Sequence, residues 1–232
     1  ATDYIAALCE SDISEASGAT LDPDRARALL RSISRSSAQE ASISTLLADV
    51  KDVGVGMSEP TLRIYLTALR RLFVIEEAKA WTPTLRSKTP LRAAAVWHLC
   101  DPSLAAASLE TNPDGLLNDL NTMGYLFESL CARDLRVYVR TMGGGIYHYR
   151  DKGGLEADII VRLQDGRWGG IEVKLGGEAR INEGASNLLT LADKVDEKKT
   201  GAPSFLAVVT GGRYAYTRPD GVHVIPLGCL AH

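Results

Sequence analysis

The most constraining feature of this 232-residue chain is a short turn sequence, Gln164-Asp165-Gly166, between two strand-like segments. These residues fit a three-residue hairpin loop, in which a type I turn ends in a glycine at positive φ. Leu163 then pairs with Arg167. Counting back along both strands places Asp158 opposite Glu172 and Glu156 opposite Lys174.

Residues that lie opposite each other in an antiparallel pair share one face, with Cβ atoms about 5 Å apart. One face of the hairpin therefore carries four charged residues: Glu156, Asp158, Glu172 and Lys174. The other face carries four apolar residues: Ala157, Ile159, Ile171 and Val173. A shift of one residue would send Asp158 and Glu172 to opposite faces, so every chemical expectation depends on this register.

Three carboxylates and one ammonium group on so small an area predict either raised pKa values or a bound cation, because two like charges 4 Å apart repel by about 4 kcal/mol at an effective dielectric of 20. Oxygen ligands favour Mg²⁺ or Mn²⁺. A metal beside Lys174 suits phosphodiester hydrolysis, since the lysine can hold the attacking water or stabilise developing charge. Glu156 is an additional ligand, or it pairs with Lys174 or solvent. The alternative is a solvated strand face with cross-strand ion pairs.

The second half of the chain reads as helix, three strands, helix and strand, followed by a hairpin. A long helix is expected over residues 114–140, with Leu120 in its apolar stripe and Glu128 at the margin of that stripe. Glu128 is thus a candidate fourth carboxylate or an ordinary helix-edge residue. The expected strands are 146–150, 155–163, 168–175, 204–210, 214–217 and 222–226, with a helix over 181–198. The apolar run 204–209 is typical of a central strand.

The first half predicts helices in the order of a winged helix. Asp22 and Ser58 are N-caps, a middle helix spans about 42–53, and a strand follows near 73–81. The third helix presents a basic face formed by Arg63, Arg70 and Arg71. These arginines are candidate contacts for DNA phosphates; otherwise they form a solvated face or a docking surface for another module.

Composition excludes several classes of protein. Hydrophobic residues make up 45% and charged residues 24%, which argues against a disordered chain. The sequence contains no long apolar run and no signal-peptide pattern, so we expect a cytoplasmic protein without a membrane partner. A net charge of -3 does not favour strong nonspecific binding to nucleic acid. Because the sequence starts without methionine, we expect it to be part of a longer chain.

Asp158 followed by Glu172-Val173-Lys174 on the next strand, after a helix bearing Glu128, resembles the PD-(D/E)xK nuclease superfamily. The resemblance implies a core of helix, three strands, helix and strand. It also implies that Asp158, Glu172 and Glu128 bind the divalent metal while Lys174 assists the attacking water. Ala157 stands where this motif has proline, a common variation in the superfamily.

More narrowly, residues 42–177 resemble the C-terminal half of a prokaryotic AAA-type ATPase family, whose members carry an ATPase module, a winged helix and a nuclease-like domain of unknown function. The resemblance lies in segments 65–76, 85–91, 101–105, 125–138 and 147–161. No phosphate-binding loop motif occurs, so an ATPase module would lie outside these residues.

Together these features predict an α/β protein with a helical, winged-helix-like domain over residues 1–90. A PD-(D/E)xK restriction-endonuclease-like domain, with a mixed sheet flanked by helices, is expected over 91–232. The expected function is DNA binding with Mg²⁺- or Mn²⁺-dependent phosphodiester hydrolysis. The alternative is a non-catalytic module with a degenerate nuclease fold that binds DNA or protein. Self-association is left open.

Overall fold

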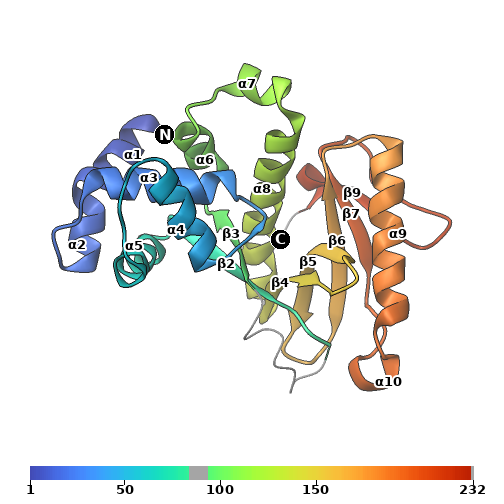
Figure 1. Cartoon of the computed structure of the whole chain (residues 1–232). Coiled ribbons are helices and arrows are strands. Elements are labelled where there is room, and N and C mark those ends of the chain that lie inside the picture. The colour runs from blue at the N-terminus through green and yellow to red at the C-terminus, as the bar shows by residue number, and fades with distance from the viewer. Residues whose placement is uncertain (84–93, 231–232) are drawn as a thin grey trace. The chain divides into compact units, whose positions relative to one another are not determined.

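The computed structural model describes residues 1–83 and 94–230 (Figure 1). The chain forms two compact units. The first comprises Ala1–Glu77 and Ala94–Leu130, and the second comprises the described residues 78–83 and 131–230. Residues 94–130, which the sequence assigns to the second domain, therefore pack with the first unit. The segment 85–91 and the expected boundary after residue 90 lie outside the described residues.

The first unit is mainly helical. The expected caps Asp22 and Ser58 are confirmed: their side chains accept hydrogen bonds from backbone N–H groups at the starts of two helices. Ser42 caps the helix between them in the same way. Its elements are α1 (Thr2–Ala7), a π-helical turn (Leu8–Asp12), α2 (Ile13–Ser17), α3 (Pro23–Arg35), β1 (Glu40–Ala41), α4 (Ile43–Asp52), α5 (Glu59–Arg71), β3 (Ala95–Leu99), α6 (Pro102–Ser108) and α7 (Pro113–Asn118).

The prediction of one long helix over 114–140 is wrong for its first residues. The structure instead has α7, a break at Asp119, and then α8 (Leu120–Thr141). Asp119 has φ of -127° and ψ of 78°, and its carboxylate accepts hydrogen bonds from the backbone N–H and the hydroxyl of Thr122. This is the behaviour of an N-cap residue, which starts a new helix. Leu120 is 59% exposed, so it does not belong to the buried stripe.

The second unit is built on a mixed sheet in the order β4-β5-β6-β7-β9-β8, with Lys79 and Ala80 of β2 (Ile75–Ala80) paired to β4. The β4–β5, β5–β6 and β8–β9 pairs are antiparallel, whereas β2–β4, β6–β7 and β7–β9 are parallel. The bounds are β4 (Gly144–Arg150), β5 (Glu156–Leu163), β6 (Trp168–Lys174), β7 (Leu206–Thr210), β8 (Tyr216–Thr217) and β9 (His223–Pro226). The expected α/β class and mixed sheet are confirmed.

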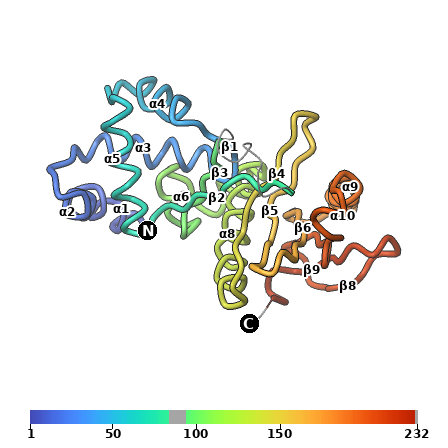
Figure 2. Tube along the Cα trace, turned by 90° about the horizontal axis from the view of Figure 1, so that it is seen from below, coloured from blue at the N-terminus to red at the C-terminus, as the bar shows by residue number. Residues whose placement is uncertain are grey.

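One face of this sheet is covered by α9 (Glu178–Lys194), which packs against β5, β6 and β7 (Figures 1 and 2). Ile160, Trp168, Leu188 and Val208 form part of the core between them. β7 lies between β6 and β9, which confirms the central strand expected from its apolar run. A short helix α10 (Glu197–Thr200) and a 3-10 turn (Leu227–Cys229) complete the unit. No helix in the described ranges has the length and apolar character needed to cross a bilayer.

Candidate active site

The hairpin between β5 and β6 has the expected register. Gly166 has φ of 93° and donates its N–H to the Leu163 carbonyl at 3.1 Å, and the Leu163 N–H is 2.9 Å from the Arg167 carbonyl oxygen. Farther along, Ile159 is the partner of Ile171. The turn therefore sets the register of β5 and β6, which brings Asp158 of one strand next to Glu172 of the other.

A β-bulge interrupts β5 at the site. Tyr147 pairs with Ile160 and Tyr149 pairs with Ala157, so Asp158 and Ile159 together lie opposite the single residue between the tyrosines. Ala157 consequently belongs to the core on the α9 side together with Ile160. The expectation that Ala157 and Ile159 simply share the face away from Glu172 is wrong for this reason. Bulges of this kind re-aim side chains beside functional sites.

Three of the predicted residues come together, because the carboxylates of Asp158 and Glu172 both contact the ammonium group of Lys174. Lys174 Nζ lies 2.5 Å from Glu172 Oε2 and 3.4 Å from Asp158 Oδ2. Asp158 Oδ2 also accepts the Val173 backbone N–H at 2.7 Å, just where the regular pairing of β5 and β6 has ended. The Asp158 carboxylate thus takes the place of a main-chain partner, which holds it beside Lys174.

The cluster lies at the boundary between the core and solvent. The Glu172 side chain is 2% exposed, whereas Asp158 and Lys174 retain 18% and 21%. Burial raises the pKa of Glu172 to about 8, with a further increase from the negative charge of Asp158 and a decrease from Lys174. Neutral pH therefore leaves this carboxyl largely protonated unless additional positive charge is supplied.

Gly184 of α9 is a part of the site that the sequence reasoning missed. A Cβ atom at this position would lie 3.1 Å from Glu172 Cβ and 3.5 Å from Lys174 Cε. The missing side chain allows the helix to approach β6 closely and to cover Glu172. An isolated glycine inside a helical pattern was the available signal, because such a glycine usually has a packing reason.

The two other acidic candidates differ in their surroundings. The negative charge of Glu156 contributes to the raised pKa of Glu172, so Glu156 lies near the cluster. Glu156 forms an ion pair with Arg150 at 3.1 Å and its side chain is 49% exposed, so its partner is neither Lys174 nor solvent alone. Glu128 is half-buried on α8, in the part of that helix that belongs to the first unit. Its role as a fourth ligand stays a prediction.

The donor set fits a magnesium-type ion. Over residues 1–83 and 94–230, no three His, Cys, Asp or Glu side chains are grouped so that they could hold one metal ion. Mg²⁺ is commonly bound through one or two carboxylates, with water and substrate phosphate oxygens supplying the remaining ligands. Asp158 and Glu172 supply the two carboxylates that such a site needs from the protein.

The basic residues proposed for DNA contact all lie in or beside α5 and all have intramolecular partners. Arg63 pairs with Glu59 at 2.7 Å and keeps a side-chain exposure of 59%. Arg70 pairs with Glu77 and lies over the Trp97 ring, 5.1 Å from its centroid. Arg71 donates to the Ala16 carbonyl at 3.0 Å. Binding of a phosphate by any of the three would therefore replace one of these contacts.

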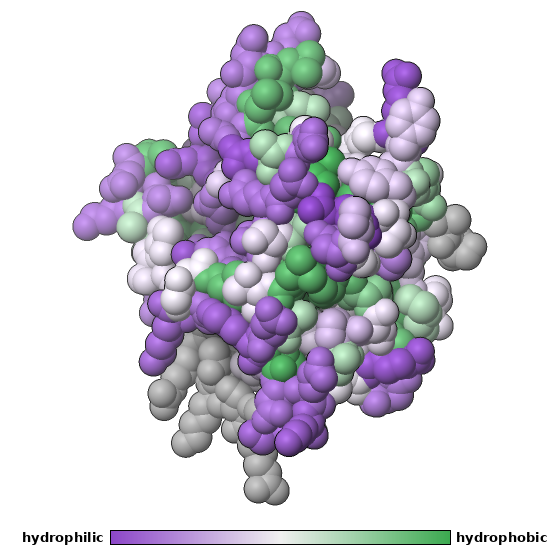
Figure 3. Space-filling model, turned by 90° about the vertical axis from the view of Figure 1, so that its right-hand side faces the viewer, coloured by the Kyte–Doolittle hydropathy of each residue, from purple (hydrophilic) through white to green (hydrophobic). Residues whose placement is uncertain are grey.

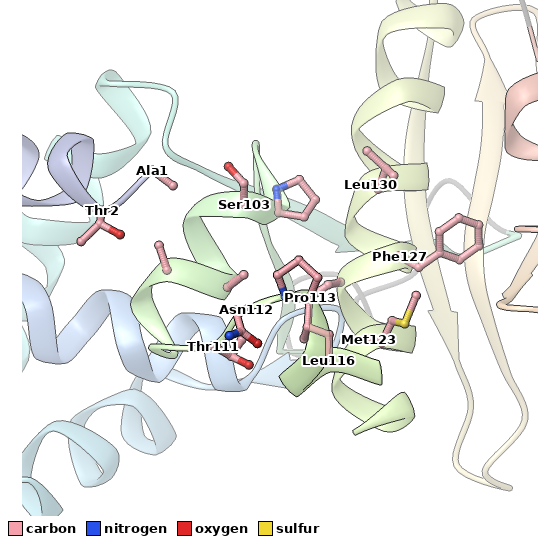
Figure 4. A pocket seen from close by; sticks show the side chains of 14 residues that line it. Ala1, Thr2, Ser103, Thr111, Asn112, Pro113, Leu116, Met123, Phe127 and Leu130 are labelled. Carbon is pink, nitrogen blue, oxygen red and sulfur yellow. The ribbon is translucent and has the colours of Figure 1, made fainter. Parts of the chain in front are cut away.

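Two cavities have none of the candidate site residues in their lining. In the first unit, an apolar cavity of about 540 Å³ lies among α6, α7 and α8 (Figure 4), with Leu116, Met123 and Leu130 in its lining. In the second unit, a more polar cavity of about 310 Å³ lies where β4 begins, beside Tyr147 and Arg162. Glycines 143–145 line it, and the last two of them belong to β4. Neither lining brings together an acid, a base and a nucleophile.

Comparison with known proteins gives two matches to family profiles. Residues 1–115 match a family described as Domain of unknown function (DUF8612), and residues 123–230 match one described as Domain of unknown function (DUF4143). No curated protein and no solved structure matches the chain. The border between the two matches lies close to the start of α8.

Proposed function

We propose that the second unit is a nuclease-like domain that hydrolyses phosphodiester bonds of DNA with the help of Mg²⁺ or Mn²⁺. The observation that carries the proposal is the contact of Lys174 Nζ with the carboxylates of both Asp158 and Glu172 on a sheet face covered by α9. Helix, three antiparallel strands, helix and parallel strand form the surrounding framework, which supports a PD-(D/E)xK-like fold.

Asp158 and Glu172 would hold the divalent ion. Such an ion, when bound, neutralises phosphate charge and lowers the pKa of its bound water. The chain contributes the rest: the Val173 N–H and the bulge fix the orientation of Asp158, and α9 excludes water from Glu172. The Lys174 ammonium is placed to donate a hydrogen bond to an attacking water or to a developing negative charge.

The first unit would supply DNA contacts. Helices α3, α4 and α5, followed by strands, support a winged-helix-like arrangement with Arg63, Arg70 and Arg71 as phosphate contacts. We further propose that both units form the C-terminal part of a AAA-type ATPase. The sequence segments that resemble that family support this proposal.

A second candidate function is a non-catalytic module that binds DNA or protein and keeps the nuclease-like fold. One observation favours it: Lys174 contacts both Asp158 and Glu172, and the Val173 N–H donates to Asp158, so both carboxyl groups already have partners within the chain. A closed ionic cluster of this kind can hold β5 and β6 together without catalysing a reaction.

A plasmid-nicking assay with Mg²⁺ or Mn²⁺ separates the two functions. Asp158→Asn and Lys174→Met keep side-chain size and remove the charges, so each should lower the nicking rate by about 10²-fold or more. Glu183→Gln is the matched control, because Glu183 pairs with Arg180 on the exposed side of α9 and should leave the rate unchanged. Equal nicking by all variants would indicate a contaminating nuclease and contradict the enzymatic proposal.

A further inference from the structure

A row of paired residues crosses the sheet from the candidate site to its edge. Glu172 of β6 is the partner of Val208, Val208 is the partner of Val224, and Val224 is the partner of Tyr216 on β8. Paired residues of neighbouring strands share a face, so Tyr216 lies on the same face as Glu172. Three strand spacings separate them by about 14 Å.

The loop that leads to β8 begins beside Lys174. Lys174 is the partner of Thr210, the last residue of β7, and the Gly211 N–H donates to the Leu175 carbonyl at 3.2 Å. β6, β7 and β9 are parallel and end at this level, because Thr210 is also the partner of Pro226. The loop 211–215 thus starts at the carboxyl ends of parallel strands, where ligands of α/β sheets bind.

This loop and the start of β8 expose aromatic and cationic side chains. Tyr214 is 80% exposed and Tyr216 is 50% exposed. Arg213 is exposed and forms no ion pair with any residue of the described chain. Hydrophilic and hydrophobic residues are mixed on the face of the molecule that lies to the right in Figure 1 (Figure 3).

The base of the same hairpin is held firmly. Arg218 pairs with Asp220 at 2.9 Å and also donates to Asn182 on α9. The Thr217 hydroxyl lies 3.0 Å from His223 Nδ1, across the β8–β9 pair. These contacts order the hairpin against α9, whereas the rings of Tyr214 and Tyr216 remain open to solvent.

We propose that residues 213–216, the tyrosine hairpin, bind unpaired bases of single-stranded DNA and lead the strand to Asp158, Glu172 and Lys174. Base faces are available for stacking in a single strand but not in an intact duplex. Exposed aromatic rings beside an arginine are the usual platform for such bases. Val208 and Val224, which lie between Tyr216 and Glu172, are buried, so the strand would reach the site around the carboxyl ends of β6 and β7 and not across the sheet. This inference names the substrate class of the proposed nuclease and rests on that function.

The test is a binding titration of the full chain in EDTA with a fluorescein-labelled oligothymidylate, followed by fluorescence anisotropy. Tyr214→Ala combined with Tyr216→Ala should raise the Kd by about fivefold to 150-fold for each stacked base lost. The corresponding double phenylalanine variant should bind as the parent chain does, because the rings remain. Tyr4→Ala, at an exposed tyrosine of the first unit, should have no effect. Circular dichroism verifies that each variant is folded.

Unchanged binding by the double alanine variant would overturn the inference, and so would an equal loss of affinity for the matching thymidylate–adenylate duplex. Binding in EDTA does not depend on cleavage, so the two proposals fail separately. Tyrosine-dependent binding without metal-dependent nicking would support the hairpin assignment and refute hydrolysis. Nicking of plasmid without tyrosine-dependent binding would support hydrolysis and refute the hairpin assignment.

Discussion

Gly184→Ala tests whether the close approach of α9 shapes the candidate site. Inside a helix, replacing glycine by alanine normally stabilises a protein by about 1 kcal/mol. Here the added methyl group would lie 3.1 Å from Glu172 Cβ and 3.5 Å from both Glu172 Cγ and Lys174 Cε. Overpacking of this kind costs about 1 to 3 kcal/mol. The free energy of unfolding should therefore fall by between zero and about 2 kcal/mol. The nicking rate should fall because Glu172 is displaced.

Two controls separate packing from helix propensity. Gly124→Ala makes the same change in α8, where a Cβ atom would meet nothing within 4 Å, and should stabilise the first unit by about 1 kcal/mol. Ser186→Ala changes an exposed position of α9 itself and should leave nicking intact. Urea denaturation followed by circular dichroism measures the stability of each variant. If Gly184→Ala is stabilised as much as Gly124→Ala and retains full activity, the reasoning about close packing is refuted.

Two further results are expected from titration and labelling. Hydrogen bonds from Lys194 and from backbone N–H groups lower the pKa of Asp151 in the folded protein. The ionised Asp151 should therefore stabilise the fold at pH values above the pKa that Asp151 has in the unfolded chain. This stabilisation should disappear as the pH falls through the lower pKa of Asp151 in the folded protein. NMR titration should show that Lys194→Ala raises this pKa; an unchanged value would contradict the assignment. Burial raises the pKa of the Cys9 thiol to about 11, so maleimide at neutral pH should label exposed Cys229 rapidly and Cys9 only after unfolding. Rapid labelling of Cys9 in the folded Cys229→Ser variant would contradict this expectation.

The fold was partly readable from the sequence because several of its determinants are local. Asp22, Ser42 and Ser58 cap helices through hydrogen bonds that span two or three residues. The break at Asp119 was missed although its capping hydrogen bonds to Thr122 are equally local, because the apolar pattern continues through this residue.

The sequence by itself determined which residues of β5 and β6 face each other, since the turn around Gly166 sets the register through its own backbone conformation. That was enough to bring Asp158, Glu172 and Lys174 together. Only the tertiary structure decided what surrounds them: the bulge opposite β4, the approach of Gly184 and the row that ends at Tyr216. Each of these depends on segments distant in the chain, and the raised pKa of Glu172 follows from its burial beside α9.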